Sequence, residues 1–469
     1  MTRLLRVFLV FASLSSLPTG YDLLTLAPSV LADSTETNSH IESLDLIPAQ
    51  TITSSLEMEI CVKVQDELLD RRMTTPGTIN VPKCEDRNFI LTGLTSDNIS
   101  EYKEEIQRLG IEDISLPKAT TDSLLRQYCD TGLLSDLKSL TLYHCENLTD
   151  ISVLSGLTGL TQLDLRYSDR LTDLSALSSL TKLTQLNLYG CEDLTDISAL
   201  SDLTELRSLS LTFCGKLNSF TALSNLRNLT SLHLHFCDNL SDVSVLSDLT
   251  SITSLSVSGC NDLTDISVLS NLTKLQSLNL MANGNLTNLS VLSDLTALTS
   301  LNLRYCGKLA DISPLSKLTK LTSLDLSGCG HLINISSLSG LKGLTSLDLT
   351  SCDGLKDITP LANLAGLNHL GSPEHVTNQQ LLWLRDKEIL TSLTSLEFFC
   401  CDSVTDISAL SGLTELTKLR IYSCHNLTDI STLSSLKGLK SLDLRGCKKI
   451  EKEDVDRLRR ELPNCEIEF

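Results

Sequence analysis

The chain has 469 residues, 41% of them hydrophobic and 4% aromatic, and a formal net charge of −20 from 38 Lys and Arg against 58 Asp and Glu. A nucleic-acid-binding surface needs an excess of basic residues to displace counterions, so this balance argues against a nucleic acid as the partner. No apolar run reaches the roughly 18 residues of a spanning helix, so no membrane span is predicted. A core of this composition must be filled mostly by Leu.

The first residues have the three-part pattern of a secretory signal. Arg3 and Arg6 introduce an apolar stretch, and small residues at the end of SVLADS supply a cleavage site after Ala32. We therefore expect a signal peptide over 1–32, a mature chain starting near Asp33, and a secreted or cell-envelope location. The alternative is the apolar N-terminus of a cytoplasmic protein.

The region before the repeats divides into two parts. Residues 33–55 are rich in Ser and Thr and predict a loose linker. Residues 56–136 predict an N-terminal cap, in which SDNISEYKEEIQRLGIEDISL reads as a capped helix followed by a strand. Cys61 and Cys84 lie in this region and are the candidates for a disulfide if the protein is exported.

Residues 137–447 repeat with a period of 23 residues and the unit LxxLxLxxCxxLTDISxLSxLTx. We count 13 clear copies and one degenerate copy. The LxL part predicts a short strand with alternate residues inward. No single unit can bury its Leu face alone, so successive units must stack around one continuous core. The LTDISxLSxLT part is too short and too polar for a long helix and predicts turns or 3₁₀ segments.

Two segments break the pattern. Residues 367–392 form an irregular unit with a helix expected to start near Thr377, and this helix carries the single Trp, Trp383. We expect Trp383 to be buried on the convex core, with a partner site as the alternative. Residues 448–469 predict a C-terminal capping helix and a final strand that cover the end of the core.

The unit resembles a leucine-rich repeat over about 330 of the 469 residues. Its LTDISxLSxLTxL half is similar to repeats of bacterial internalins and of the phosphatase-1 regulatory subunit, and its Cys position is similar to the cysteine-containing repeats of F-box-type proteins. The resemblance implies an α/β fold: a right-handed leucine-rich-repeat solenoid (horseshoe) with a curved parallel sheet on the concave face and short turns or 3₁₀ segments on the convex side. Such proteins mostly bind other proteins on the concave sheet. The chain departs from these families because we find neither an immunoglobulin-like module or wall anchor after the repeats nor an F-box before them.

One repeat position carries eleven Cys, which raises the question of zinc or disulfides. The same position also accepts Ser168 and Asn283, an exchange that metal ligation would not tolerate. All three residue types can donate to a neighbouring backbone carbonyl. We therefore predict a buried structural ladder and no metal site or cofactor. Its Cys members are Cys145, Cys191, Cys214, Cys237, Cys260, Cys306, Cys329, Cys352, Cys401, Cys424 and Cys447.

A second repeat position is acidic, and the alternatives for it are calcium binding and capping. Ser219, Asn288 and Asn334 replace Asp in the remaining copies. Asp, Ser and Asn are the residues that accept hydrogen bonds from backbone N–H groups at a helix start, so capping of the convex turn is predicted. The carboxylates are Asp150, Asp173, Asp196, Asp242, Asp265, Asp311, Asp357, Asp406 and Asp429.

The positions that the repeat does not dictate lie just after the second Leu of LxL, on the concave surface or at its edge. They hold many Tyr, Phe, His and Arg side chains, of the types enriched at interface hot spots. The alternative is a structural role, in which these residues only cover the edge of the sheet. The candidate partner-binding residues are Tyr143, His144, Arg166, Tyr167, Tyr189, Phe213, His235, Phe236, Arg304, Tyr305, Phe399 and Tyr422.

No nucleophile and base are arranged for catalysis, and we find no phosphate loop, HExxH or GxSxG motif, so no enzyme is predicted. The sequence favours a non-catalytic scaffold, exported or at the cell surface, that captures a protein partner on its concave face. The alternative is an intracellular regulatory or substrate-adaptor subunit of the phosphatase or ubiquitin-ligase type. A purely structural cell-envelope spacer is a third interpretation.

Overall fold

The computed structural model describes residues 49–54, 59–64, 67–74, 77–82, 87–91 and 94–469. The predicted signal over 1–32 lies outside the described residues. So does Cys84, and the suggested disulfide with Cys61 therefore stays a prediction. Residues 49–54, at the end of the predicted linker, form strand β1 (Ala49–Ser54), which differs from the loose coil expected there. The Thr-Ile-Thr run in this segment has high strand propensity, which the overall Ser/Thr content concealed.

The N-terminal strands pair in two groups. Strand β1 is antiparallel to β4 (Gly77–Pro82). Strand β2 (Glu59–Val64) is antiparallel to both β3 (Glu67–Thr74) and β5 (Arg87–Ile90). Strand β5 then pairs in parallel with the first strand of the main sheet, so the second group continues into the repeats.

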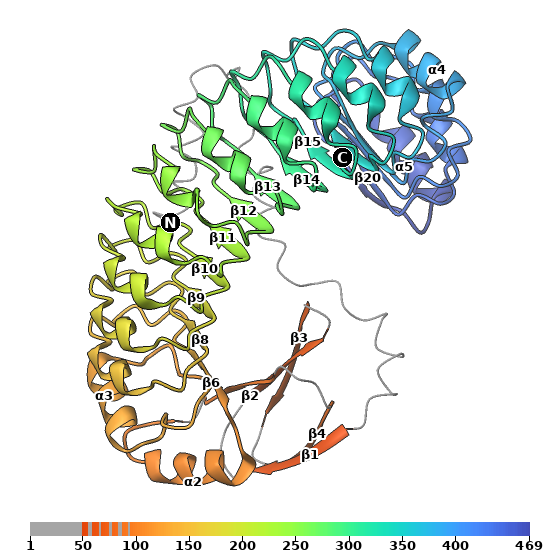
Figure 1. Ribbon diagram of the computed structural model, residues 1–469. Helices are drawn as coiled ribbons and strands as arrows, with labels where there is room; N and C mark the ends of the chain where they lie inside the picture. The colour runs from red at the N-terminus through yellow and green to blue at the C-terminus, as the bar shows by residue number, and fades with distance from the viewer. Residues whose placement is uncertain (1–48, 55–58, 65–66, 75–76, 83–86, 92–93) are drawn as a thin grey trace.

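The main sheet is an open, curved array of parallel strands, each hydrogen-bonded to the next in chain order, and it lines the inner side of the arc in Figure 1. Its strands are β6 (Asp113–Ser115), β7 (Ser139–Thr141), β8 (Gln162–Asp164), β9 (Gln185–Asn187), β10 (Ser208–Ser210), β11 (Ser231–His233), β12 (Ser254–Ser256), β13 (Ser277–Asn279), β14 (Ser300–Asn302), β15 (Ser323–Asp325), β16 (Ser346–Asp348), β17 (His369–Ser372), β18 (Ser395–Phe399), β19 (Lys418–Tyr422), β20 (Ser441–Asp443) and β21 (Glu466–Glu468).

The register places each Leu beside the equivalent Leu of the next unit. Leu140 pairs with Leu163, and Leu163 pairs with Leu186, so a step of one strand equals a step of 23 residues. Both Leu residues of an LxL are buried, as at Leu140 and Leu142, while the residues between and after them face the concave side. One continuous hydrophobic core fills the space between the sheet and the convex segments.

Short 3₁₀ helices form the convex side, as predicted. They lie on the outer rim of the arc in Figure 1. They are η3 (Ser152–Gly156), η4 (Ser175–Ser179), η5 (Ser198–Asp202), η6 (Thr221–Asn225), η7 (Ser244–Leu246), η8 (Ser267–Asn271), η9 (Ser290–Asp294), η10 (Ser313–Lys317), η11 (Ser336–Gly340), η12 (Thr359–Asn363), η13 (Ser408–Leu410) and η14 (Ser431–Ser435).

Among the described residues, the α-helices lie before the regular repeats and in the C-terminal part of the solenoid. Helices α2 (Ile99–Leu109) and α3 (Asp122–Asp130) precede the regular repeats. Helix α4 (Asn378–Asp386) starts after Thr377, whose side chain forms a capping box with Gln380. Trp383 on this helix is partly buried against the core, so one part of the ring remains exposed. Helix α5 (Lys452–Glu461) and β21 end the described chain.

Candidate partner-binding site on the concave face

The candidate residues fall into two columns at the end of each strand. The first column follows the second Leu of LxL. The second is the next residue, whose backbone adopts positive φ, as at Tyr167 (φ 59°) and Phe236 (φ 53°). Backbone hydrogen bonds between neighbouring units fix the columns: Tyr167 N donates to Tyr189 O over 2.8 Å, and Phe213 N donates to His235 O over 2.9 Å. Side chains of adjacent units are therefore held one strand apart.

In the first five units the rings of the two columns touch one another in a continuous row, which we call the aromatic ridge. Tyr143 meets Tyr167 with centroids 5.6 Å apart, Tyr167 meets Tyr189 at 5.0 Å, and Tyr189 meets Phe213 at 5.3 Å. His144 stacks on Tyr167 at 4.3 Å, and Phe213 stacks on Phe236 at 4.8 Å. All ridge side chains are half-buried. The ridge consists of Tyr143, His144, Tyr167, Tyr189, Phe213 and Phe236.

The second-column residues of the ridge have an unfavourable backbone conformation. Positive φ costs a non-glycine L-residue about 1–2 kcal/mol, and bulky residues there are uncommon. In other units the equivalent position holds glycine, at φ between 68° and 78°, or a smaller non-glycine residue, at φ between 54° and 59°. The glycines are Gly190, Gly259, Gly328 and Gly446, and the non-glycine residues are Ala282, Ser351, Cys400 and Ser423. A Cβ on Gly259 would clash with the Phe236 ring, so this glycine also leaves room for the ring of the preceding unit. Strained residues of this kind tend to occur at functional sites.

Several of the polar groups around the ridge are paired or neutral, and Lys118 adds a cation whose Nζ lies over the Tyr143 ring, 5.4 Å from its centroid. Arg166 bonds to Asp164 over 2.7 Å while its guanidinium lies 4.9 Å from the centroid of Tyr143. His144 Nδ1 lies 3.6 Å from a carboxylate oxygen of Glu146. At the other end, burial and the neighbouring His233 lower the pKa of His235 to about 4. This imidazole is therefore uncharged at pH 7.

Arg304 and Tyr305 lie apart from the ridge, further along the sheet. Arg304 Nη2 donates to the Tyr305 hydroxyl over 3.0 Å, and the guanidinium lies 4.8 Å from the ring centroid. Asp325 and Asp348 occupy adjacent strands nearby. Burial, reinforced by the charge of Asp348, raises the pKa of Asp325.

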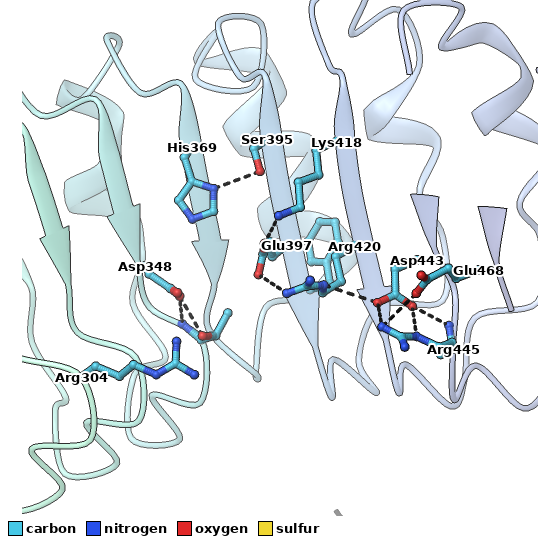
Figure 2. A network of polar contacts seen from close by, with 12 residues as sticks. Arg304, Asp348, His369, Ser395, Glu397, Lys418, Arg420, Asp443, Arg445 and Glu468 are labelled. Carbon is cyan, nitrogen blue, oxygen red and sulfur yellow. Dashed lines mark hydrogen bonds and ion pairs between the residues drawn. The ribbon is translucent and has the colours of Figure 1, made fainter. Parts of the chain in front are cut away.

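The C-terminal strands carry a third arrangement, a charge network across β18 to β21 that Figure 2 shows. Glu397 pairs with Lys418 at 3.6 Å and with Arg420 at 3.3 Å. Arg420 also reaches Asp443 at 3.4 Å. Burial acts to raise the pKa of Asp443, but the hydrogen bonds and charges of its arginine partners outweigh it and hold this pKa below its ordinary value.

Arg445 completes the charge network, which we define as Glu397, Lys418, Arg420, Asp443, Arg445 and Glu468. It bonds to Asp443 over 2.8 Å and to Glu468 over 3.0 Å, which links the last two strands (Figure 2). Phe399 and Tyr422 stack beside the network with centroids 5.3 Å apart.

The structure thus places the twelve candidate residues in three separate groups. The ridge residues and the flanking Arg166 and His235 form the first, Arg304 and Tyr305 the second, and Phe399 and Tyr422 the third. The charge network was not predicted from the sequence. The alternation of sign along Glu397, Arg420 and Asp443, each one unit apart, is the signal that shows it.

The Cys ladder forms as predicted. Cys191 Sγ donates to Leu165 O over 3.4 Å, and equivalent contacts recur from Cys145 to Cys447. The amide of Asn283 makes the same contact, to Val257 O over 2.7 Å. Ser168 is the exception, because its hydroxyl is buried without a hydrogen-bond partner. A serine Oγ has a shorter reach than a cysteine Sγ, so the expected carbonyl contact is not made.

The ladder thiols are free throughout residues 94–469. Burial raises the pKa of both Cys145 and Cys191 to about 12. Because the thiolate is the reactive form, these thiols are chemically protected. Among the described residues, no group of three or more His, Cys, Asp or Glu side chains is placed to hold a metal ion.

The acidic column caps the convex turns as predicted. Asp196 Oδ1 accepts from Ser198 N over 2.8 Å, and Asn288 makes the same bond to Ser290 N over 2.9 Å. This backbone hydrogen bond lowers the pKa of Asp196. The weakest cap is Ser219, whose hydroxyl lies 3.4 Å from Thr221 N.

Comparison with known families identifies the repeats. The model of the BspA-type leucine-rich repeat region matches residues 132–233, 165–280 and 233–356. The model of the leucine-rich repeats of plant disease resistance protein RPS2-like proteins matches residues 308–448. With the stacked 23-residue units described above, these matches show that the chain is a leucine-rich repeat protein. No curated protein matches it.

Many solved structures are similar to this chain, and three of them illustrate the likeness. An internalin (InlF) of Listeria monocytogenes is 30% identical over 66% of this chain and 81% of its own, with a TM-score of 0.46. The functional domain of InlJ from the same organism, described as including a cysteine ladder, is 25% identical over 70% of this chain and 66% of its own, with a TM-score of 0.49. A leucine-rich repeat protein of Leptospira interrogans is 18% identical over 80% of this chain and 98% of its own, with a TM-score of 0.50, and it shares the solenoid fold.

Within the described part of the chain, no helix has the length and apolarity needed to cross a membrane.

Proposed function

We propose that the protein is a non-catalytic scaffold that captures a protein partner on its concave face, with the aromatic ridge at the centre of the contact. The observation that carries this proposal is the unbroken row of half-exposed rings from Tyr143 to Phe236. Tyr and other large aromatic side chains supply much of the binding energy at protein interfaces because they bury a large area with few rotatable bonds.

Two physical arguments favour binding over simple cover for the sheet edge. Ser258 and Gly259 follow strand β12 at the same two column positions without any ring, so large side chains are not needed to complete a unit. The rings of Tyr167 and Phe236 also sit on backbone of positive φ, which is unfavourable for folding. Extended concave surfaces are the parts of solenoids that bind partners.

We infer further that the protein is exported. The sequence pattern over 1–32 supports this inference, and the raised pKa values of the buried ladder thiols remove the main objection to it. An intact-mass measurement on cell and secreted fractions, after alkylation of free thiols, tests it. A mature chain starting near Asp33 in the secreted fraction is expected. A full-length chain confined to the cytoplasm would favour the intracellular adaptor instead.

The binding proposal is tested by partner capture with the full chain, followed by quantitative binding to the partner identified. The Tyr143→Ala/Tyr189→Ala double variant removes two first-column rings of the ridge. Because a hot-spot side chain contributes about 2 kcal/mol or more, loss of the two rings together should lower affinity by on the order of 1000-fold.

The matched control is Phe399→Ala/Tyr422→Ala, which removes two rings from the same face outside the ridge. We expect this variant to bind within about 3-fold of wild type, a difference below 1 kcal/mol. Equal affinity of wild type and ridge variant, with unchanged unfolding midpoints, would contradict the proposal.

A further inference from the structure

Two aspartates lie side by side in the middle of the concave sheet, and we call them the central pair. Asp325 ends β15 and Asp348 ends β16, and the parallel register places the two residues directly beside each other. Neighbouring strands lie about 4.8 Å apart, and paired residues project from the same face. Within the described part of the chain, no ion pair joins either carboxylate to a cation.

The same repeat position in other units shows that this arrangement is unusual. Asp164 and Asp443 also occupy it, and each pairs with the arginine two residues further on. The distances are 2.7 Å from Asp164 to Arg166 and 2.8 Å from Asp443 to Arg445. In the two units of the central pair this second position holds a serine and a threonine, so the counter-charge is missing.

The fold does not require a charge at this position. Asp325 Oδ1 accepts hydrogen bonds from the backbone N of Ser327 over 2.8 Å and from its Oγ over 2.6 Å. The other member of the pair is held in the same way by the threonine of its own unit. Asn279 and Asn302 accept the equivalent backbone bond over 2.9 Å. A neutral amide therefore does the same structural work.

The neighbouring strands supply a single cation to the central pair. Arg304, which follows β14, acts on the pair through its charge, but its guanidinium bonds to the Tyr305 hydroxyl over 3.0 Å. On β17 the adjacent residue is Gly371, where a Cβ would clash with the nearer carboxylate. His369 Nδ1, also on β17, lies 3.1 Å from Ser395 Oγ and is thereby held toward the next strand (Figure 2).

The buried side of the sheet offers no counter-charge either. The titratable groups there are the ladder thiols Cys329 and Cys352, whose pKa values burial raises, to about 12 for Cys352. Both thiols are therefore neutral at pH 7. In these surroundings burial, reinforced by the charge of Asp348, raises the pKa of Asp325.

We propose that the central pair is a proton-dependent element of the solenoid: Asp325 holds a proton in mildly acidic solution, and its loss near neutral pH places two like charges side by side and weakens the contact between β15 and β16. The folded state favours the protonated carboxyl. This contribution to stability is therefore fully present below the ordinary carboxyl pKa of about 3.9 and is lost as the pH rises through the higher pKa of the folded state. The middle of the concave face thus gains negative charge as the pH rises.

Urea unfolding of the full chain at a series of pH values from 4 to 8 tests this inference. Asp348→Asn keeps the backbone acceptor and removes one of the two charges. At pH 7 we expect it to lower the equilibrium constant of unfolding by roughly 3-fold or more. This gain should shrink as the pH falls toward 4, where Asp325 of the wild type is protonated. The matched control is Asp164→Asn, which breaks the pair with Arg166 and should not stabilise the protein at any pH.

A second variant and a local measurement complete the test. Asp325→Asn should stabilise the protein at pH 7 as Asp348→Asn does, and the double variant should gain no more than either single one, because either change removes the repulsion. Hydrogen exchange of peptides covering β15 and β16, corrected for intrinsic rates, should show protection in wild type that falls between pH 4 and pH 7, and no such fall in Asp348→Asn.

Three results would each overturn the inference. They are no gain from Asp348→Asn at pH 7, a gain that persists unchanged to pH 4, and an equal gain from Asp164→Asn. Fully additive gains in the double variant would likewise show that the two carboxylates do not act on each other. The measurements use the isolated chain, so they are independent of partner capture on the ridge.

Discussion

The aromatic ridge and the charge network occupy the same concave sheet, yet they use it in opposite ways. Over β7 to β11 the side chains beyond the buried Leu residues are rings that touch one another and stay half-exposed. Over β18 to β21 they are carboxylates and cations that satisfy each other from strand to strand (Figure 2). The backbone is the same, so the few positions that the repeat leaves variable decide what each region does.

The two regions differ in how much their side-chain contacts stabilise the folded state. Ring pairs contribute about 0.5–1.5 kcal/mol beyond area burial, and the positive φ of the second-column residues offsets a comparable amount. The ridge therefore adds little to the folded state and keeps its exposed area for a partner. In the charge network, Asp443 is 9% exposed and contacts two arginines, so its contacts act within the fold.

The largest difference in stability is expected at Asp443. Asp443→Ala leaves Arg420 and Arg445 without their shared carboxylate, and we expect a loss of about 1–3 kcal/mol in the free energy of unfolding. Asp164→Ala, the matched change beside the ridge, breaks one pair with a 40%-exposed Arg166 and should cost about 0.5–1 kcal/mol. Urea unfolding of the two variants measures the difference. Equal losses would show that the C-terminal network holds the strands no better than the single pair beside the ridge.

The next largest change in stability is expected in the Cys ladder, which belongs to neither concave region. Cys191→Ser shortens the donor that reaches Leu165 O and should destabilise by about 1 kcal/mol. Ser168→Cys supplies a donor that can reach the carbonyl contact missing at Ser168 and should stabilise by a similar amount, about 1 kcal/mol. Denaturant midpoints of the two variants and their double give the measurement. A destabilised Ser168→Cys would mean that this unit is packed for serine.

The smallest effect concerns the convex caps, which are the same behind both regions. Asp196→Ala behind the ridge and Asp429→Ala behind the network should each cost about 0.5–1 kcal/mol at pH 7. Unequal losses would place part of the difference between the regions on the convex side.

The pH dependence of these caps follows from their lowered pKa values. A carboxylate whose folded pKa lies below its unfolded value stabilises the protein above about pH 4, and this contribution is lost as the pH falls through the folded pKa. Asp196→Asn keeps the acceptor and should remove this part of the acid sensitivity. Acid unfolding curves at pH 2–5 test the sign, and a variant more acid-sensitive than wild type would contradict it.

Most of the fold could be predicted because it is set by periodicity. The 23-residue spacing of Leu and Cys fixes the strands, the register and the ladder, and the Asp, Asn and Ser alternatives at one position predict the caps. The helix after Thr377 is predictable from local capping chemistry. The half-exposure of Trp383 and the unpaired hydroxyl of Ser168 are not, because both depend on distances to the neighbouring unit that the repeat pattern does not contain.

The repeat positions of the candidate residues could be predicted from the sequence, but the contacts between their side chains could not. The sequence places Tyr143 and Tyr189 in one column and Tyr167 in the next, but it does not show that the three rings contact one another in a row. The positive φ of the second column is signalled by Gly190, Gly259 and Gly328 at the same position in other units.

Site-specific photo-crosslinking tests the central claim most directly. The full chain would carry p-benzoylphenylalanine in place of Tyr189 on the ridge or in place of Tyr422 beside the charge network, and would be exposed to the captured partner. The account predicts a covalent adduct from position 189 and little or none from position 422. Adducts from position 422 alone, or equally from both positions, would contradict the assignment of partner binding to the ridge.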